Sequence, residues 1–492
     1  MNGEKGHMNG SPAFRSDLTA FRDKRVLVAG LKRSGRAAAL ALYNLGARVS
    51  ITDMKTAGEL EGSKDLPPGI GLYLGGHPEE ALDGVDFVVA SPGVPMDRGL
   101  LKTASGRGIE IIGELELGYR LFKLENPLVD FLAVTGTNGK STTSTLLHFM
   151  LRKAGGNAIL AGNIGDALTG FFGAEGAKQT DAVVVEVSSF QLEAVSDFKP
   201  RVAAILNLAP DHLDRYASLD AYYGAKMRIY ERQDEGDFLV LNAVDAACRE
   251  IAGRLSGGPV RGPVRRASVP GVIYFGGFLG GNAGEKQKGR GLYERKGSVF
   301  IDLPGMETEL IKTSEIRIKG AHNLENAMAA SCMALLAGAP VEAVRAALME
   351  FPGLAHRMEF VRELEGVTYI NDSKGTNPPA VLRSLQSFGE RPIILIAGGR
   401  DKNGDFGSLR KTVREHVRLV VLIGEAAEKL EAALRGAAEI RKAGDMGEAG
   451  RMARRAACPG EVVLLSPACA SFDMFEDFED RGRKFAAEVQ AL

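Results

Sequence analysis

The residues best suited to chemistry lie in the run Thr135–Thr142, which reads Thr-Gly-Thr-Asn-Gly-Lys-Ser-Thr. The apolar run Phe131–Val134 before it predicts a buried strand, and the apolar spacing after it predicts a helix. A Gly-rich turn between a strand and a helix presents backbone N–H groups to an anion. Lys140 adds a positive charge, and the Ser141 hydroxyl can bind Mg²⁺. The sequence therefore predicts a loop that binds the phosphates of a nucleoside triphosphate.

The glycine spacing of this loop is shorter than usual. The pattern G-x-x-x-x-G-K-[ST] would place a glycine at Val134, but the first glycine is Gly136. We therefore expect a shorter variety of phosphate-binding loop.

Two potential metal ligands follow other predicted strands. Glu186 interrupts the apolar run Ala182–Val187, where a carboxylate must be paired or must bind a metal. His212 follows the apolar run Val202–Leu208, at the edge where parallel sheets bind ligands. We expect Glu186 to position Mg²⁺ and His212 to bind a second metal or a phosphate, with a structural salt bridge as the alternative for Glu186. Asn163 is either a turn residue or a polar contact that faces the site.

The N-terminal turn Gly30–Gly35 resembles a dinucleotide-binding turn, but Lys32 occupies the position of its middle glycine. Asp53 ends the next predicted strand, where an acidic residue commonly contacts a ribose or base edge. A nucleotide diphosphate fits this turn better than NAD does. The alternative is a turn that merely joins a strand to a helix.

Three further strand exits lie near the C-terminus, at Asn371–Pro378, Gly398–Lys402 and Ser466–Ser471. Cations and hydroxyls at the ends of parallel strands should meet in one crevice. Because this part of the chain has no phosphate loop, we expect it to bind a small anionic partner.

The length of 492 residues predicts about three domains. Repeated β-α-β-α order predicts an α/β fold in which each domain has a mostly parallel, doubly wound sheet. The expected parts are a disordered lead-in (1–20) and domains at 21–126, 127–354 and 355–492, the second of which carries the phosphate loop. The basic, Gly-rich segment Gly253–Gly297 is expected to be a solvated loop or an antiparallel excursion.

Composition excludes several classes of protein. A net charge of −1 argues against nucleic-acid binding, and no apolar run approaches the roughly 20 residues that span a bilayer. Met1–Ser16 lacks the apolar core of a signal peptide, and the four cysteines show no CxxC spacing. We expect a cytoplasmic monomer with reduced thiols and without membrane insertion.

Taken together, these motifs resemble the Mur ligase family, the ATP-dependent amide ligases of peptidoglycan precursor synthesis. The resemblance extends from Lys24 to the C-terminus. The turn Gly30–Gly35, Asp53, Asn371–Lys374 and Ser471–Phe478 resemble the members that join D-glutamate to UDP-N-acetylmuramoyl-L-alanine through an acyl phosphate. A sister ligase or a folylpolyglutamate-type ligase that adds another amino acid is the nearest alternative.

The resemblance implies roles for individual residues. Lys140, Glu186, His212 and Lys226 would be catalytic. Two Mg²⁺ ions would be held by Ser141, Glu186, His212 and Lys226, the lysine in carbamylated form. ATP would be bound by Gly136, Thr137, Asn138, Gly139, Lys140, Ser141, Thr142, Asn323, Asn326, Arg357 and Asp372. The UDP-substrate would be bound by Arg33, Ser34, Asp53, Lys55, Gly93 and Asn163. D-glutamate would be bound by Lys374, Thr376, Lys402, Ser471 and Phe478.

Two alternatives lie outside the ligases. An NAD-dependent oxidoreductase built on the first block is disfavoured by Lys32 in the fingerprint turn. A regulatory or motor ATPase would share the phosphate loop but would hydrolyse ATP without an amino acid.

Overall fold

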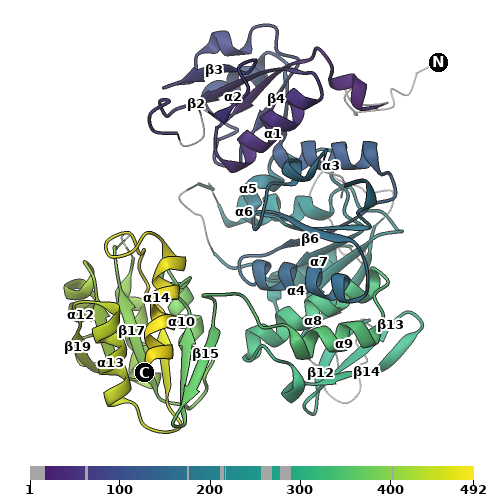
Figure 1. The fold of residues 1–492 in the computed structure, drawn as a ribbon. Helices are drawn as coiled ribbons and strands as arrows, with labels where there is room; N and C mark the ends of the chain where they lie inside the picture. Colours follow the sequence, from purple (N-terminus) through teal and green to yellow (C-terminus); the bar gives the residue numbers. More distant parts are fainter. Residues whose placement is uncertain are drawn as a thin grey trace. The chain divides into compact units, whose positions relative to one another are not determined.

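The computed structural model describes residues 17–60, 65–173, 177–210, 215–216, 218–255, 269–277, 290–401 and 404–492. By their contacts, the residues form two compact units, Met1–Ile316 with Glu325–Met349 and Arg317–Leu324 with Glu350–Leu492. The first unit contains two β-sheets and the second unit contains one (Figure 1). The disordered lead-in expected over 1–20 falls mostly on residues outside the described ones. However, Leu18–Phe21 already form a short 3-10 helix, and Phe21 is buried.

The first sheet has five parallel strands in the order β3-β2-β1-β4-β5. They are β1 (Arg25–Ala29), β2 (Arg48–Asp53), β3 (Gly71–Leu74), β4 (Phe87–Ala90) and β5 (Glu110–Gly113), joined by α1 (Arg33–Asn44) and α2 (Gly99–Gly106) and followed by α3 (Glu114–Glu125). Alternate residues of β1 point to opposite faces, so Val26 and Val28 pack with α1 and α3, while Leu27 and Ala29 pack with α2. The strand order reverses between β1 and β4, and the crevice at such a reversal is where these sheets bind ligands.

Among the described residues, the second sheet has nine strands in the order β14-β13-β12-β11-β10-β9-β6-β8-β7, and only β13 runs antiparallel to the others. Its strands are β6 (Asp130–Thr135), β7 (Ala158–Gly162), β8 (Ala182–Glu186), β9 (Val202–Ile205), β10 (Phe238–Asn242), β11 (Gly271–Phe275), β12 (Gly291–Arg295), β13 (Ser298–Leu303) and β14 (Met306–Lys312). The helices are α4 (Lys140–Lys153), α5 (Ser189–Leu192), α6 (Leu219–Met227), α7 (Ala246–Leu255), α8 (Ala321–Leu336) and α9 (Val341–Glu350). Phe131 and Ala133 of β6 are fully buried in a core that includes residues of α3 and α7.

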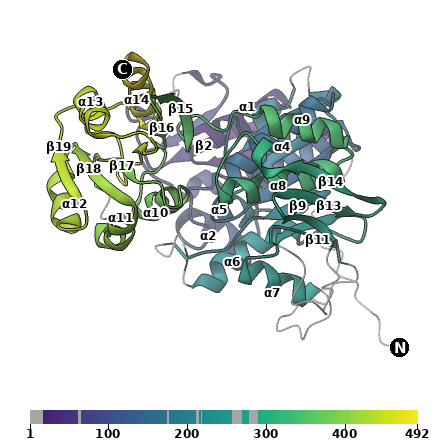
Figure 2. The same ribbon diagram turned by 90° about the horizontal axis from the view of Figure 1, so that it is seen from below.

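The sheet of the second unit has the order β15-β16-β20-β17-β18-β19, and β15 is the only antiparallel strand among the residues of this sheet that the structure describes. Its strands are β15 (Glu359–Leu364), β16 (Val367–Asn371), β17 (Ile393–Gly398), β18 (Val417–Ile423), β19 (Glu439–Lys442) and β20 (Val462–Leu465). One face is covered by α10 (Pro378–Gln386), α11 (Arg410–His416) and α12 (Ala427–Leu434), and the other by α13 (Met446–Ala456) and α14 (Phe478–Ala491). Figure 2 shows these helices flanking the strands from a second direction.

The predicted α/β class with mostly parallel, doubly wound sheets is confirmed. Two details differ. The strand predicted over Val202–Leu208 ends at Ile205, because the chain from Asn207 onward bonds to the phosphate loop instead of the sheet. The basic segment Gly253–Gly297 contains two strands: β11 pairs in parallel with β10, and β12 forms an antiparallel pair with β13. Residues 256–268 and 278–289 of this segment lie outside the described residues. The predicted domain boundaries remain predictions.

No helix among the described residues has the length and apolarity needed to cross a bilayer.

Candidate active site

The predicted phosphate loop lies between the carboxyl end of β6 and the first residue of α4, Lys140. Gly139 directly precedes the helix with a φ of 83°, a conformation that side chains rarely adopt. A Cβ at Gly139 would lie only 2.3 Å from Oδ1 of Asn326, so glycine is required where α8 approaches the loop. The Lys140 ammonium donates to the carbonyls of Gly136 and Thr137 at 3.0 and 3.1 Å. The cation therefore lies over the loop it was predicted to serve.

Asn207 holds the loop in shape from the neighbouring strand. Its Oδ1 accepts from the Asn138 backbone N–H at 2.8 Å, its Nδ2 donates to the Asn138 carbonyl at 3.2 Å, and its own carbonyl accepts from Thr137 N–H at 3.0 Å. This residue was not among the predicted site residues. In the sequence, Asn207 is a polar residue inside the apolar run Val202–Leu208, and this interruption is a signal that could have pointed to it.

Glu186 and Asn163 lie in contact. Glu186 ends β8 and is 2% exposed, and its Oε1 accepts from Asn163 Nδ2 at 2.7 Å. Its other oxygen, Oε2, is buried and has no hydrogen-bond partner among the described residues. A buried carboxylate oxygen left in this state suits a cation. His212 lies outside the described residues. Among the described residues, no cluster of three or more His, Cys, Asp or Glu is arranged to hold a metal.

Lys226 comes to the phosphate loop from α6. Its side chain is 2% exposed, and its Nζ donates to the Gly136 carbonyl at 2.9 Å. The ammonium also lies 4.9 Å from the ring centroid of Tyr222. The structure thus brings together Lys140, Lys226, Asn326 and the loop, whereas Asn323 lies one helical turn earlier on α8 and donates to the Lys319 carbonyl at 2.9 Å.

The predicted nucleotide-binding turn is held at the reversal point of the first sheet. The Asp53 carboxylate accepts from the backbone N–H groups of Leu31 at 2.7 Å and Lys55 at 2.9 Å. A Cβ at Gly35 would lie 1.8 Å from the Gly30 carbonyl, so only glycine lets α1 start this close to β1. Ser34 is half-buried in the first turn of α1, while Lys55 and Gly93 are exposed at neighbouring strand ends.

Arg33 makes contacts that the sequence did not predict. Its guanidinium donates to the carbonyls of Gly162 and Asn163 at 3.2 and 3.4 Å, and also to that of Gly165. It therefore links α1 of the first sheet to the loop after β7 of the second sheet. Its predicted contact with a uridine diphosphate stays a prediction.

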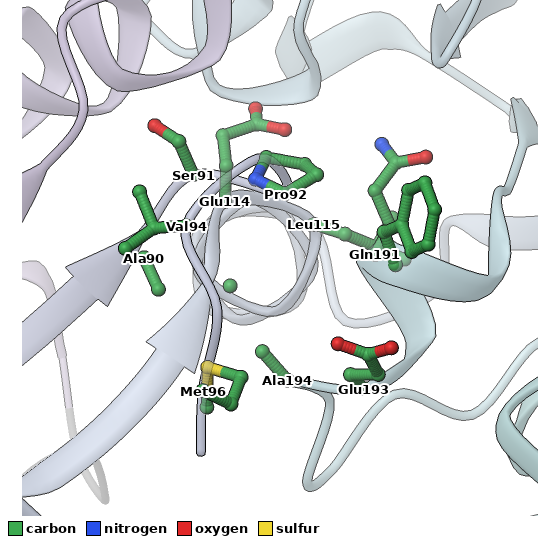
Figure 3. A pocket seen from close by; sticks show the side chains of 12 residues that line it. Ala90, Ser91, Pro92, Val94, Met96, Glu114, Leu115, Gln191, Glu193 and Ala194 are labelled. Carbon is green, nitrogen blue, oxygen red and sulfur yellow. The ribbon is translucent and has the colours of Figure 1, made fainter. Parts of the chain in front are cut away.

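A small pocket lies between these two sheets of the first unit (Figure 3). Residues that follow β4 line one side, and Gln191 and Glu193 from the α5 region line the other. Glu114, at the start of α3, also lines it. The Glu114 carboxylate accepts from the backbone N–H and hydroxyl of Thr169 at 2.7 and 2.8 Å, and burial raises its pKa. The full lining is Ala90, Ser91, Pro92, Val94, Met96, Gly113, Glu114, Leu115, Phe190, Gln191, Glu193 and Ala194.

In the second unit, the strand exits meet as predicted. Asp372, after β16, is 4% exposed, and its Oδ2 accepts from the hydroxyls of Ser384 at 2.6 Å and Ser466 at 2.8 Å. Burial raises the pKa of this carboxyl to about 6. Ala468, after β20, donates its N–H to the Gly375 carbonyl at 2.8 Å. Arg357 lies near enough that its charge partly offsets the effect of burial on Asp372.

A fully buried arginine forms hydrogen bonds with the loops that follow β16 and β20. Arg481 on α14 donates to Ser373 Oγ at 2.9 Å, to the Ser373 carbonyl at 2.8 Å and to the carbonyls of Cys469 and Ala470 at 3.2 Å. Desolvation lowers its pKa to about 10. Sequence reasoning missed Arg481, because a single arginine on a helix resembles a surface residue.

The predicted amino-acid ligands lie beside Arg481. The Lys374 ammonium is 3.7 Å from the ring centroid of Phe478, Thr376 follows on the same loop, and Ser471 is buried. Lys402 lies outside the described residues.

Comparisons with known proteins cover nearly the whole chain. Residues 24–113 match the Mur ligase MurD-like N-terminal domain, 134–334 the Mur ligase middle domain and 356–469 the Mur ligase glutamate ligase domain. A UDP-N-acetylmuramoylalanine--D-glutamate ligase of Caldanaerobacter subterraneus is 41% identical, over 96% of this chain and 99% of the relative. The ligase of the same name from Geotalea uraniireducens is 42% identical, over 96% and 98%.

Solved structures agree on the fold. The UDP-N-acetylmuramate-alanine ligase of Thermotoga maritima superposes with a TM-score of 0.54 at 20% identity, over 95% of this chain and 99% of that one. A pseudomurein peptide ligase from Methanothermus fervidus gives 0.55 at 18% identity, over 95% and 99%. These relatives match the chain over nearly their full length. The chain, with its phosphate loop and its strand-end clusters, therefore belongs to the Mur ligases.

Proposed function

We propose that this chain is the ATP-dependent ligase that joins D-glutamate to UDP-N-acetylmuramoyl-L-alanine, releasing ADP and phosphate, in peptidoglycan precursor synthesis. The observation that carries the proposal is the identity of 41–42% with ligases named for this reaction, over 96% of the chain. The geometry supports it, because a built phosphate loop and a separate cluster of polar strand ends suit a triphosphate and a small anionic amino acid.

The chemistry requires an activated carboxylate, because a carboxylate and an amine do not condense unaided in water. A carboxylate oxygen of the alanyl group attacks the γ-phosphorus of ATP, the bond to ADP breaks, and an acyl phosphate forms. The amine of D-glutamate then attacks the acyl carbon and a C–N bond forms. The acyl C–O bond breaks, inorganic phosphate leaves with the bridging oxygen and the electron pair, and a proton is released from the amine nitrogen. Lys140 and the other backbone N–H groups of the loop bind the phosphates during the first step, while Asn207 fixes the loop by accepting from the N–H groups of Thr137 and Asn138.

Two Mg²⁺ ions complete the proposal. Ser141 and Glu186 would hold one, and His212 and Lys226 the other, with Lys226 as its carbamate. The partnerless oxygen of Glu186 fits a cation. When bound, such ions supply positive charge that stabilises the transferring phosphoryl group.

The other assignments follow the same proposal. Asn323, Asn326, Arg357 and Asp372 would contact the adenosine part of ATP. Arg33, Ser34, Asp53, Lys55, Gly93 and Asn163 would contact the nucleotide sugar. We also propose that the enzyme is a monomer and that it is cytoplasmic, since its co-substrate is ATP.

The amino acid is proposed to bind at Lys374, Thr376, Lys402, Ser471 and Phe478. Two cationic side chains and directed hydroxyls suit a dicarboxylate, and a site built to pair two carboxylates rejects partners that leave its charges unmatched. The L-enantiomer exchanges the directions of amine and carboxylate, so it cannot satisfy both ends at once.

The deciding experiment is an ADP-release assay with UDP-N-acetylmuramoyl-L-alanine and ATP, run with D-glutamate, L-glutamate, L-alanine or a diamino acid. We expect turnover with D-glutamate only. Lys374→Ala and Ser471→Ala should raise the KM for D-glutamate much more than that for the nucleotide, while Lys411→Ala, whose side chain is 87% exposed, should change neither. Equal turnover with another amino acid would identify a sister ligase, and ADP release without any amino acid would indicate an ATPase.

A further inference from the structure

Arg215 bonds to both sides of the pocket in the first unit, yet the proposed function gives it no role. Its guanidinium donates to the Pro92 carbonyl at 3.0 Å and to the Glu193 carboxylate at 3.0 Å. Its Cζ also lies 4.1 Å from the ring centroid of Phe190. All three partners line the pocket, Pro92 after β4 of the first sheet and the other two around α5 of the second. The Arg215 side chain is only 19% exposed, so these contacts are shielded from water.

Aromatic contacts continue from this arginine to the phosphate loop. Phe190 stacks on Tyr216 with ring centroids 5.8 Å apart, and Tyr216 lies 5.3 Å from Tyr222. Lys226 then lies over Tyr222, and its Nζ bonds the Gly136 carbonyl. An unbroken series of contacts therefore joins the loop after β4 to the buried lysine.

We propose that Arg215 is a positioning residue for the nucleotide-sugar substrate, because its guanidinium fastens the loop that carries Gly93 to α5. The inference rests on the proposed function, in which Gly93 contacts that substrate. Pro92, whose carbonyl Arg215 holds, directly precedes Gly93 in the chain. Without the guanidinium, substrate binding would have to order the loop, and that cost would weaken affinity for this substrate alone.

The planar guanidinium is needed for this arrangement. Arg215 reaches a carbonyl through Nη1 and a carboxylate through Nη2 while its plane lies over an aromatic ring. A lysine ammonium is a single point charge and cannot reproduce all three contacts. Arg215→Lys should therefore fall between the wild type and Arg215→Ala.

The test compares Arg215→Ala and Arg215→Lys with Arg232→Ala. Arg232 is a matched control because it is an arginine whose Nε donates to the Ser196 carbonyl at 2.6 Å, in the segment that follows α5. For Arg215→Ala we expect the KM for UDP-N-acetylmuramoyl-L-alanine to rise about tenfold, and the KM for ATP and for D-glutamate to stay within about twofold. Millimolar guanidinium should partly restore the nucleotide KM of Arg215→Ala, which a general loss of structure would not permit.

Unchanged nucleotide KM in Arg215→Ala, or a parallel rise in all three KM values, would overturn the inference. If the wild-type enzyme does not ligate D-glutamate, the proposed function fails instead. In that case calorimetric binding of UDP-N-acetylmuramoyl-L-alanine to the wild type and to Arg215→Ala still decides the role of Arg215, with a weaker affinity in the variant expected.

Discussion

Lys226 is a buried lysine whose ammonium group bonds the phosphate loop, a setting that a helix lysine rarely has. An ammonium so close to the loop would compete with a cation for the triphosphate. Reaction of the neutral amine with CO₂ would convert it into an anionic carbamate that Mg²⁺ stabilises. The charge of this one side chain is therefore decisive for the proposed second metal ion.

We predict that Lys226→Ala lowers ligase activity by at least about 100-fold, because it removes a ligand of the proposed Mg²⁺ ion that stabilises the transferring phosphoryl group in the transition state. Added formate or acetate should partly restore activity by placing a carboxylate in the vacated space. Initial rates of ADP release, with and without the short acids, measure this. Activity that is indifferent to the substitution would contradict the carbamate proposal.

Asp372 gives the second unit a pH-dependent stability. Its pKa is about 6 when folded, against 3.8 for the free side chain, so the folded state binds its proton at pH values where the unfolded chain has released it. Stability therefore falls as pH rises from about 4 to about 6, by roughly 2–3 kcal/mol in total, and this contribution is flat above that range.

Asp372→Asn should remove that slope, since asparagine does not titrate. Urea unfolding at pH 4.5, 5.5 and 7, monitored in parallel for the wild type, the variant and an exposed control, Asp83→Asn, measures the difference. A slope that Asp372→Asn leaves intact would show that another group titrates.

At the scale of elements, α3 is attached to the second sheet by a buried carboxylate. Glu116 is fully buried, and it accepts from the backbone N–H groups of Ser196 and Asp197 at 2.9 Å and Phe198 at 3.1 Å, and from Arg120 Nε at 2.7 Å. This single side chain satisfies three N–H groups and a buried cation. It therefore fixes the helix that follows the first sheet onto the core of the second.

We predict that Glu116→Ala lowers the free energy of unfolding by roughly 3 kcal/mol, because it leaves three amides without their acceptor and removes one of the carboxylates that pair with the buried Arg120, Glu110 and Asp197 being the others. Hydrogen exchange should show faster exchange at Ser196, Asp197 and Phe198. Glu79→Ala, which removes an ion pair at 3.2 Å from a side chain 67% exposed, should cost no more than about 1 kcal/mol. Equal effects of the two substitutions would be inconsistent with this account.

At the scale of the whole molecule, the proposed monomer can be tested directly. Sedimentation equilibrium at micromolar concentration should return the mass of one chain, 52.4 kDa. A mass near twice this value would show a dimer.

The local features of the fold could be predicted from the order of the amino acids. The phosphate loop, its strand and its helix could be predicted because glycine, lysine and apolar spacing act over a few neighbouring residues. The same holds for α10, which begins at Pro378 after the Asn377 cap. Strands such as β7, β10 and β13 went unpredicted, since short strands depend on neighbours across the sheet.

Which charged residues are buried, and which groups they bind, depends on how distant parts of the chain pack together. Arg481, Arg215 and Glu116 look like surface residues in the sequence, because a charge on a helix or loop is usually solvated. Each is buried or shielded by partners far along the chain: Arg481 by loops after β16 and β20, Arg215 by the loop after β4, and Glu116 by residues 196–198. Sequence spacing carries no information about such contacts, since they exist only once distant strands have been brought side by side.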